Sequence, residues 1–173
     1  DPDGDDVAFS LLSSTDLFEI NSASGSISVL QPLDYEDQSV YSLVILVAEI
    51  RTGREYHLTD THSFSVQVLD VNEPPTLSNN VFDIEENVPI GTIVGTIFGN
   101  DPELGLLTYE IVSSAAITEV FQINKLNQIV TKEAKLDYET NPYYAFTVVA
   151  VDNGNLTSTP ATVEVVLHDV NEP

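Results

Sequence analysis

The chain has 173 residues, 42% of them hydrophobic, which is enough to bury a core in one large or two small domains. Its 28 acidic residues against 5 Lys and Arg give a net charge of −23, which excludes nucleic acids and anionic membrane surfaces as default partners. The absence of cysteine excludes disulfides, zinc thiolates and cysteine catalysis. The longest apolar run, Leu43–Ala48, is too short to cross a bilayer, so we expect no membrane insertion by this segment.

Strand patterns follow one another along the whole chain. The first half contains five short patterns beginning near Val7, and the clearest of them alternates Tyr41, Leu43, Ile45 and Val47 with other residues. The second half contains seven, near 80–87, 91–98, 106–113, 121–123, 128–131, 143–152 and 161–169. No window of ten or more residues shows a helical stripe. The patterns therefore predict an all-β fold built from β-sandwiches.

The chain also contains an internal repeat. Leu33-Asp34-Tyr35-Glu36 recurs 103 residues later as Leu136-Asp137-Tyr138-Glu139. Asp70-Val71-Asn72-Glu73-Pro74 recurs 99 residues later as Asp169-Val170-Asn171-Glu172-Pro173. The difference between the two offsets places a short insertion in the first copy, around Arg51 to His62. Ordered matches at one period indicate a tandem array of modules of about 100 residues.

The repeat predicts two domains, 1–72 and 73–173. The second has seven expected strands and is complete. The first supplies only the last five, so we expect its two opening strands to lie before Asp1.

Several short motifs carry a resemblance to a known family. They are Glu86-Asn87, Asp101-Pro102-Glu103, Leu136-Asp137-Tyr138-Glu139, Ala150-Val151-Asp152 and Asp169-Val170-Asn171-Glu172-Pro173. Because these motifs occur in this order, the second copy resembles a cadherin extracellular repeat over its whole length. The first copy resembles the later two-thirds of one. The resemblance implies tandem Greek-key immunoglobulin-like β-sandwiches with seven strands in each complete repeat.

Cadherin repeats bind three calcium ions at each junction between consecutive domains, and the resemblance implies such a site in the middle of this chain. The residues that match the family's ligands there are Asp34, Glu36, Asp70, Asn72, Glu73, Asp101, Glu103 and Asp152. The chemistry agrees, because these side chains are hard oxygen donors of the kind that Ca²⁺ takes six to eight of. Carboxylates gathered at one place would also repel one another without a cation.

Both ends of the chain carry further half-sites by the same resemblance. Those that would face a preceding repeat are Asp1, Asp3 and Glu49, and those that would face a following repeat are Glu86, Asp137, Glu139, Asp169, Asn171 and Glu172. The central linker departs from the family pattern at Glu73 and Pro74, and Glu103 replaces an aspartate. The first copy also lacks the Glu-Asn segment. We therefore expect fewer or more weakly bound calcium ions at the central junction than in a complete one.

Other chemistry has little support in the sequence. An EF-hand reading of the first six residues fails because its glycine is misplaced and Leu12 stands where the closing glutamate belongs. His57, His62 and His168 have no mutual spacing that would build a site, and no nucleophile motif is present, so we expect no enzyme. Asn155-Leu156-Thr157 is a glycosylation sequon, which only a eukaryotic secretory pathway would use.

Together these features predict calcium-binding extracellular repeats of a calcium-dependent cell-adhesion protein, in which calcium makes the interdomain junction rigid. The expected partners are neighbouring repeats of the same chain and another cadherin or surface protein. One alternative is a structural spacer in a long surface or bacterial adhesin-type protein, and another is a carbohydrate-binding or hydrolase accessory module. Adhesion through a tryptophan-anchored first strand has no support, because the chain contains no tryptophan.

Overall fold

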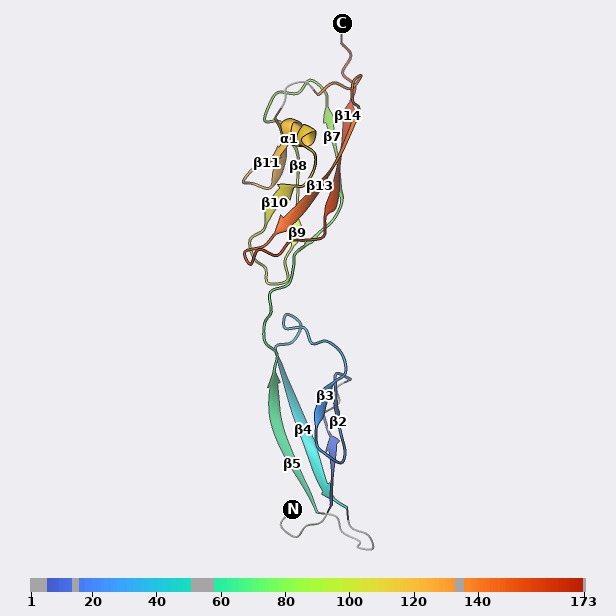
Figure 1. The fold of residues 1–173 in the computed structure, drawn as a ribbon, viewed down its shortest axis with the longest axis vertical. Coiled ribbons are helices and arrows are strands. Elements are labelled where there is room, and N and C mark those ends of the chain that lie inside the picture. The colour runs from blue at the N-terminus through green and yellow to red at the C-terminus, as the bar shows by residue number, and fades with distance from the viewer. Residues whose placement is uncertain (1–5, 14–15, 51–57, 133–135, 173) are drawn as a thin grey trace. The chain divides into compact units, whose positions relative to one another are not determined.

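A computed structural model describes residues 6–13, 16–50, 58–132 and 136–172 of the chain (Figure 1). The chain divides into two compact units, a first unit of Asp1–Val71 and a second unit of Asn72–Pro173, one residue before the boundary expected from the repeat. Asp1 and Asp3, which the sequence assigned to a half-site, lie outside the described residues.

The described part of the first unit contains five strands, of which the first begins at Val7 as expected. They are β1 (Val7–Leu11), β2 (Phe18–Ile20), β3 (Ile27–Val29), β4 (Val40–Glu49) and β5 (Thr59–Gln67). β1, β4 and β5 form an antiparallel sheet in that order, and β2 and β3 form a separate antiparallel pair. Alternating apolar side chains along β4 place one row against the β2–β3 pair, as the period of two requires.

Among its described residues, the second unit has nine strands and one short helix. In chain order they are β6 (Thr76–Leu77), β7 (Asn80–Glu85), β8 (Ile93–Thr96), β9 (Gly99–Asn100), β10 (Thr108–Ile111), α1 (Ala115–Val120), β11 (Phe121–Ile123), β12 (Gln128–Thr131), β13 (Tyr143–Val151) and β14 (Ala161–His168). One sheet has the order β10-β13-β14-β7, a second has the order β11-β12-β8, and β6 pairs with β9. All pairings are antiparallel except that of β7 with β14, which is parallel.

The seven strands expected in the second copy are all present. Three further elements were not expected. The strands β6 and β9 have only two residues each, too few to show an alternating pattern. The helix α1 has six residues, too few to give a helical stripe over ten residues, although Ile117 and Val120 pack against the core. In the first unit β5 already begins at Thr59, so the insertion predicted around Arg51 to His62 lies partly in this strand and partly in residues 51–57, outside the described chain.

The core of the second unit lies between its two larger sheets. One sheet contributes Phe146, Val148, Val163, Val165 and Leu167, and the other contributes Phe121 and Ile129. The Phe121 ring lies at the centre of this core, with its centroid 5.4 Å from that of Phe146 in a stacked arrangement and 5.2 Å from that of Tyr144 in an edge arrangement. Such aromatic contacts add to the free energy gained by burying the rings.

The core of the first unit is thinner. It buries three hydrophobic residues, Phe18, Tyr41 and Leu43, with Phe18 packed edge-on against Tyr41 at 5.3 Å. Ile45 is half-buried, whereas Val148, its counterpart 103 residues later, is fully buried. The reason is that β7 and β8 cover the corresponding face in the second unit. Within the described part of the first unit, no strand pairs with the outer edge of β5 as β7 pairs with β14.

This difference predicts unequal costs for matched core substitutions. Phe121→Ala should lower the free energy of unfolding of the second unit by about 3–5 kcal/mol, because the cavity opens inside a fully packed core. Phe18→Ala should cost the first unit less, since Phe18 has fewer buried neighbours. Hydrogen exchange of each unit, measured across a urea series, gives both values. Phe98→Ala, which replaces a 77% exposed ring, is the control and should change stability by no more than about 0.5 kcal/mol. Equal losses in the two units would contradict this account of their cores.

Candidate metal centres

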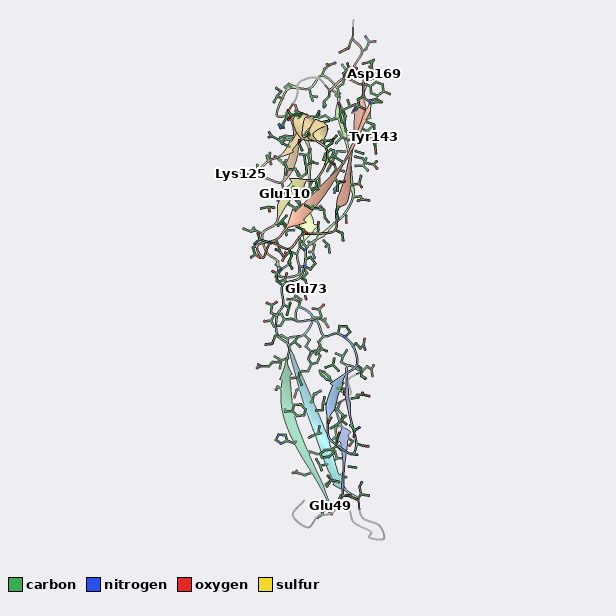
Figure 2. The ribbon with its side chains drawn as sticks, in the orientation of Figure 1. Glu49, Glu73, Glu110, Lys125, Tyr143 and Asp169 are labelled. Carbon is green, nitrogen blue, oxygen red and sulfur yellow. The ribbon has the colours of Figure 1, made fainter. Side chains whose placement is uncertain are left out.

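Acidic side chains gather at the C-terminal end of the second unit. Because β7 and β14 are parallel, with Glu85 opposite His168, the residues that follow both strands emerge at the same end. The antiparallel strand β13 begins at that end, so the turn that precedes it lies there too. Here the "C-terminal cluster" means the side chains that these three segments supply: Glu86, Asp137, Glu139, Asp169, Asn171 and Glu172. Figure 2 labels Asp169 at this end of the unit.

Glu86 is the buried member of the C-terminal cluster. Its side chain is 3% exposed, and its two carboxylate oxygens accept hydrogen bonds from the backbone N–H groups of Tyr138 and Val170, both at 2.8 Å. Glu86 therefore ties the turn before β13 to the segment after β14. A buried carboxylate with backbone donors on both oxygens is held in one orientation.

Asp137 is positioned by the turn that precedes β13. Its carboxylate accepts hydrogen bonds from the hydroxyl of Thr140 at 2.7 Å and from the backbone N–H of Thr140 at 3.0 Å. These bonds, with the hydroxyl contributing most, lower the pKa of Asp137 below its ordinary value. The same turn occurs in the first unit, where Asp34 accepts from the backbone N–H groups of Glu36 and Asp37.

Glu139 completes a compact group with Glu86 and Asp137. One carboxylate oxygen from each residue lies within 4.8 Å of the other two. A hydrogen bond from its own backbone lowers the pKa of Glu139, but desolvation and the negative charges of Glu86, Asp169 and Asp137 outweigh it and raise the pKa above its ordinary value. The raised pKa shows that the surroundings of Glu139 disfavour a further negative charge.

The remaining members of the C-terminal cluster follow β14 and are exposed. Glu172 accepts a hydrogen bond from the side-chain amide of Asn87, which has a left-handed backbone with φ 56°. Asp169 contributes to the charge around Glu139, and Asn171 is exposed.

A second acidic group lies at the opposite end of the second unit, where Figure 2 labels Glu73. β6 and β9 are antiparallel, so the residues before β6 lie beside those after β9, and β13 also ends there. The "linker-end cluster" is the group that results: Asn72, Glu73, Asp101, Glu103 and Asp152. Asn72 donates to Asp152 at 2.7 Å, and the backbone N–H of Glu73 donates to Glu103 at 2.9 Å.

Hydrogen bonds favour the charged forms of Glu103 and Asp152 in the linker-end cluster. The hydrogen bond from the backbone of Glu73 is the largest influence on Glu103 and lowers its pKa. Burial acts to raise the pKa of Asp152, but hydrogen bonds from Asn72 and from the backbone of Leu156 and its neighbours lower it overall. Within the described residues, Asp101 Oδ2 and Glu103 Oε2 are buried and accept no hydrogen bond. Buried carboxylate oxygens without donors are a strong reason to expect a cation.

Four of the residues that the sequence predicts as calcium ligands lie in the described part of the first unit. Asp34 and Glu36 lie in the turn before β4, and Asp70 follows β5; all three are exposed. Glu49 ends β4 and pairs with Val7 of β1. The sequence predicts that Tyr35 and Tyr138 pack within the Leu-Asp-Tyr-Glu turn. Their side chains are 39% and 37% exposed, so neither is buried there.

Three contributors to these sites were missed by the sequence reasoning. Thr140 and Asn87 donate to acidic side chains, and the backbone N–H of Gly105 donates to Asp101 at 3.0 Å. Asn87 stands inside the Glu-Asn motif and could have been found from it. Thr140 and Gly105 act through local turn geometry, which their residue types alone do not signal.

Comparison with known proteins identifies the family. A family model described as Cadherin domain matches residues 1–69 and 80–168. Human Protocadherin Fat 1 is 34% identical over 96% of this chain, and rat Cadherin-17 is 32% identical over 86%. This chain spans only 4% and 18% of those two proteins.

Solved structures show the same architecture. The crystal structure of human Protocadherin-24 EC1-2 matches 99% of this chain, with the match covering 85% of that chain, at a TM-score of 0.72 and 22% identity. This likeness shows the fold and confirms the predicted immunoglobulin-like β-sandwiches.

The comparisons bear on several sequence-based predictions. They confirm the resemblance to cadherin repeats, and they confirm that the chain is not an enzyme, since the matched domains are adhesion domains. No helix among the described residues has the length and apolar character needed to span a membrane.

The Asp137 turn yields a test. In Thr140→Val the hydroxyl donor is lost, so the pKa of Asp137 should rise toward its ordinary value. A lowered pKa contributes stability that is present above the unfolded-state pKa and is lost as the pH falls through the folded-state pKa, so this variant should lose that contribution. A carboxyl-carbon NMR titration in chelator measures the shift. Thr118→Val, whose hydroxyl bonds the carbonyl of Ala115 in α1, is the control. An unchanged Asp137 titration in Thr140→Val would contradict this assignment.

Proposed function

Because the chain belongs to the cadherin domain family, we propose that it is a calcium-binding extracellular segment of a cell-adhesion protein, in which calcium makes the junctions between repeats rigid. The observation that carries the proposal is the convergence of Glu86, Asp137 and Glu139 at the end of a rigid sandwich, with carboxylate oxygens within 4.8 Å of one another.

The C-terminal cluster fits calcium by its chemistry. Ca²⁺ takes six to eight oxygen ligands at flexible geometry, and three carboxylates supply up to six oxygens. Asp169, Asn171 and Glu172 offer further oxygens on the segment after β14. Mg²⁺ demands a tighter octahedral arrangement, and the chain has no cysteine to favour a softer metal.

The linker-end cluster fits calcium for a different reason. Asp101 Oδ2 and Glu103 Oε2 are buried without a donor in the described chain, so a cation there would satisfy two oxygens that protein groups leave without a partner. Asn72, Glu73 and Asp152 add oxygen atoms to the same end. We extend the proposal to Asp34, Glu36 and Asp70 of the first unit as the ligands that would complete the central junction.

We also propose the calcium half-site that would face a preceding repeat, although the structure describes only one of its residues. Glu49 is its described member, and Asp1 and Asp3 belong to it by their motif.

Calcium would act by changing the balance of charge. Two carboxylates about 4 Å apart repel by about 1 kcal/mol in bulk water and about 4 kcal/mol at an effective dielectric of 20. A divalent cation would replace this repulsion with attraction and would hold together the segments that carry the carboxylates. Extracellular calcium modules bind with dissociation constants of about 10⁻⁴–10⁻³ M, so the sites would fill outside cells and empty in cytosol. Rigid tandem repeats would then present a surface to another cadherin or surface protein.

Removal of one carboxylate tests the C-terminal cluster. Glu139→Gln should weaken calcium binding at this end by about tenfold or more, which corresponds to at least about 1.4 kcal/mol, because one charged ligand becomes neutral. Glu110→Gln is the matched control, since Glu110 is exposed on β10 between the two ends of the unit (Figure 2). Isothermal titration calorimetry of both variants measures the effect. Identical calcium titrations of the two variants would contradict the assignment.

The central junction has its own test. In calcium, small-angle scattering of the native chain should show a narrower distribution of interdomain angles than in chelator. Asp101→Asn and Glu36→Ala should each abolish this narrowing and leave the circular dichroism of the strands unchanged. If calcium does not alter the distribution of interdomain angles in the native chain, the junction proposal is wrong. The calcium titration of Glu139→Gln then tests the C-terminal cluster separately.

A further inference from the structure

The turn between β13 and β14 contains an asparagine that the fold leaves available. Residues 153–157 of this turn are exposed, and Asn155 has a left-handed backbone with φ 64°. The turn is held by Asp152, whose carboxylate accepts from the N–H of Leu156 at 2.8 Å and whose backbone carbonyl accepts from the N–H of Asn155 at 3.3 Å. The turn therefore depends on the backbone of Asn155 and not on its side chain.

The side chain of Asn155 makes no hydrogen bond within the described part of the chain. Six other asparagines use their side chains to hold turns, strands or acids, namely Asn21, Asn72, Asn79, Asn80, Asn87 and Asn124, whereas Asn155 shares its unbonded side chain with the remaining described asparagines. Thr157, two residues on, is also exposed and its hydroxyl makes no hydrogen bond in the described chain. By contrast, the hydroxyl of the neighbouring Ser158 is buried and accepts from the N–H of Ala150 at 3.0 Å.

The left-handed backbone explains an asparagine at position 155, because asparagine tolerates that conformation better than most residues. It does not explain a hydroxyl at position 157, where the backbone alone forms the bridge to Val151. We propose that Asn155 is an N-glycosylation site, with Thr157 as the hydroxyl residue that the acceptor sequence Asn-x-Thr requires. The inference rests on the extracellular placement proposed above, because only a chain in the eukaryotic secretory pathway meets the sugar donor.

The modification is a transfer from a lipid-pyrophosphate-linked oligosaccharide. Nδ2 of Asn155 forms a bond to C1 of the first sugar, and the bond between C1 and the pyrophosphate oxygen breaks. The amide nitrogen loses one proton, and the lipid pyrophosphate leaves. No hydrogen bond of the folded turn is lost in this reaction, because Nδ2 of Asn155 donates none in the described chain.

The position of the glycan has a consequence for the neighbouring linker-end cluster. Asp152 turns its carboxylate toward Asn72 and toward the backbone N–H of Leu156. The glycan at Asn155 would start from an exposed side chain that takes no part in these bonds. It would therefore cover the turn and exclude a protein partner from it, while leaving calcium binding unchanged.

The test is peptide mapping of the whole chain secreted from mammalian cells, with and without an N-glycosidase that converts a glycosylated asparagine to aspartate. We expect Asn155 to be recovered as aspartate after treatment and Asn153 to remain asparagine. Thr157→Ala keeps the turn-forming asparagine and should abolish the mass increase, and Thr157→Ser should retain it. Secreted native chain with unmodified Asn155, or equal modification of Thr157→Ala, overturns the inference.

Calcium titration of the glycosylated and enzymatically deglycosylated chains separates this inference from the proposed function. Equal calcium affinities support a glycan that stays clear of the linker-end cluster, and a several-fold weaker affinity of the glycosylated chain contradicts that placement. A chain that is modified at Asn155 but binds no calcium supports the glycosylation site and contradicts the calcium proposal.

Discussion

Repulsion between carboxylates at the two ends of the second unit is the constraint on which the rest of this structure depends. The parallel pairing of β7 with β14 delivers Glu86 and Asp169 to one end, and the start of β13 adds Asp137 and Glu139. Backbone N–H groups offset part of this charge at Glu86, but they leave Glu139 with a raised pKa. The fold therefore brings like charges together at this end of the second unit.

The two clusters differ in how they are prepared for a cation. At the C-terminal end, Glu86 is fixed by two backbone donors and the neighbouring acids are more exposed. At the linker end, Asp101 and Asp152 are both 5% exposed. Asn72 donates a hydrogen bond to Asp152, which follows β13, and the backbone of Glu73 donates one to Glu103, which follows β9. A packed core around Phe121 makes this positioning firm. In the proposed function, calcium then transmits the rigidity of each sandwich to its neighbour.

Strand positions and the repeat could be predicted from the sequence because both rest on local patterns, such as the alternation along Tyr41–Val47 and the recurrence of Leu-Asp-Tyr-Glu. The acidic residues that are proposed as ligands could be named because the motifs mark them. The parallel pairing of β7 with β14 could not be predicted from local pattern, since it joins residues more than 80 positions apart. The two-residue strands β6 and β9 could not be predicted either, because they are too short to show a periodic pattern. The donors Thr140 and Gly105 could not be predicted because they act through local turn geometry.

The most direct test of the central claim is thermal unfolding of the native chain in calcium, in magnesium and in chelator, with the second unit followed by hydrogen exchange. A ligand at ten to one hundred times its dissociation constant stabilises the folded state by about 1.4–2.7 kcal/mol, which corresponds to about 6–20 °C in the melting temperature of a domain of this size. With dissociation constants of about 10⁻⁴–10⁻³ M, we predict such a rise in about 10 mM calcium and a much smaller one in the same concentration of magnesium. Melting temperatures that are the same in calcium and in chelator would contradict the account, and the acids at both ends would then be ordinary surface charge.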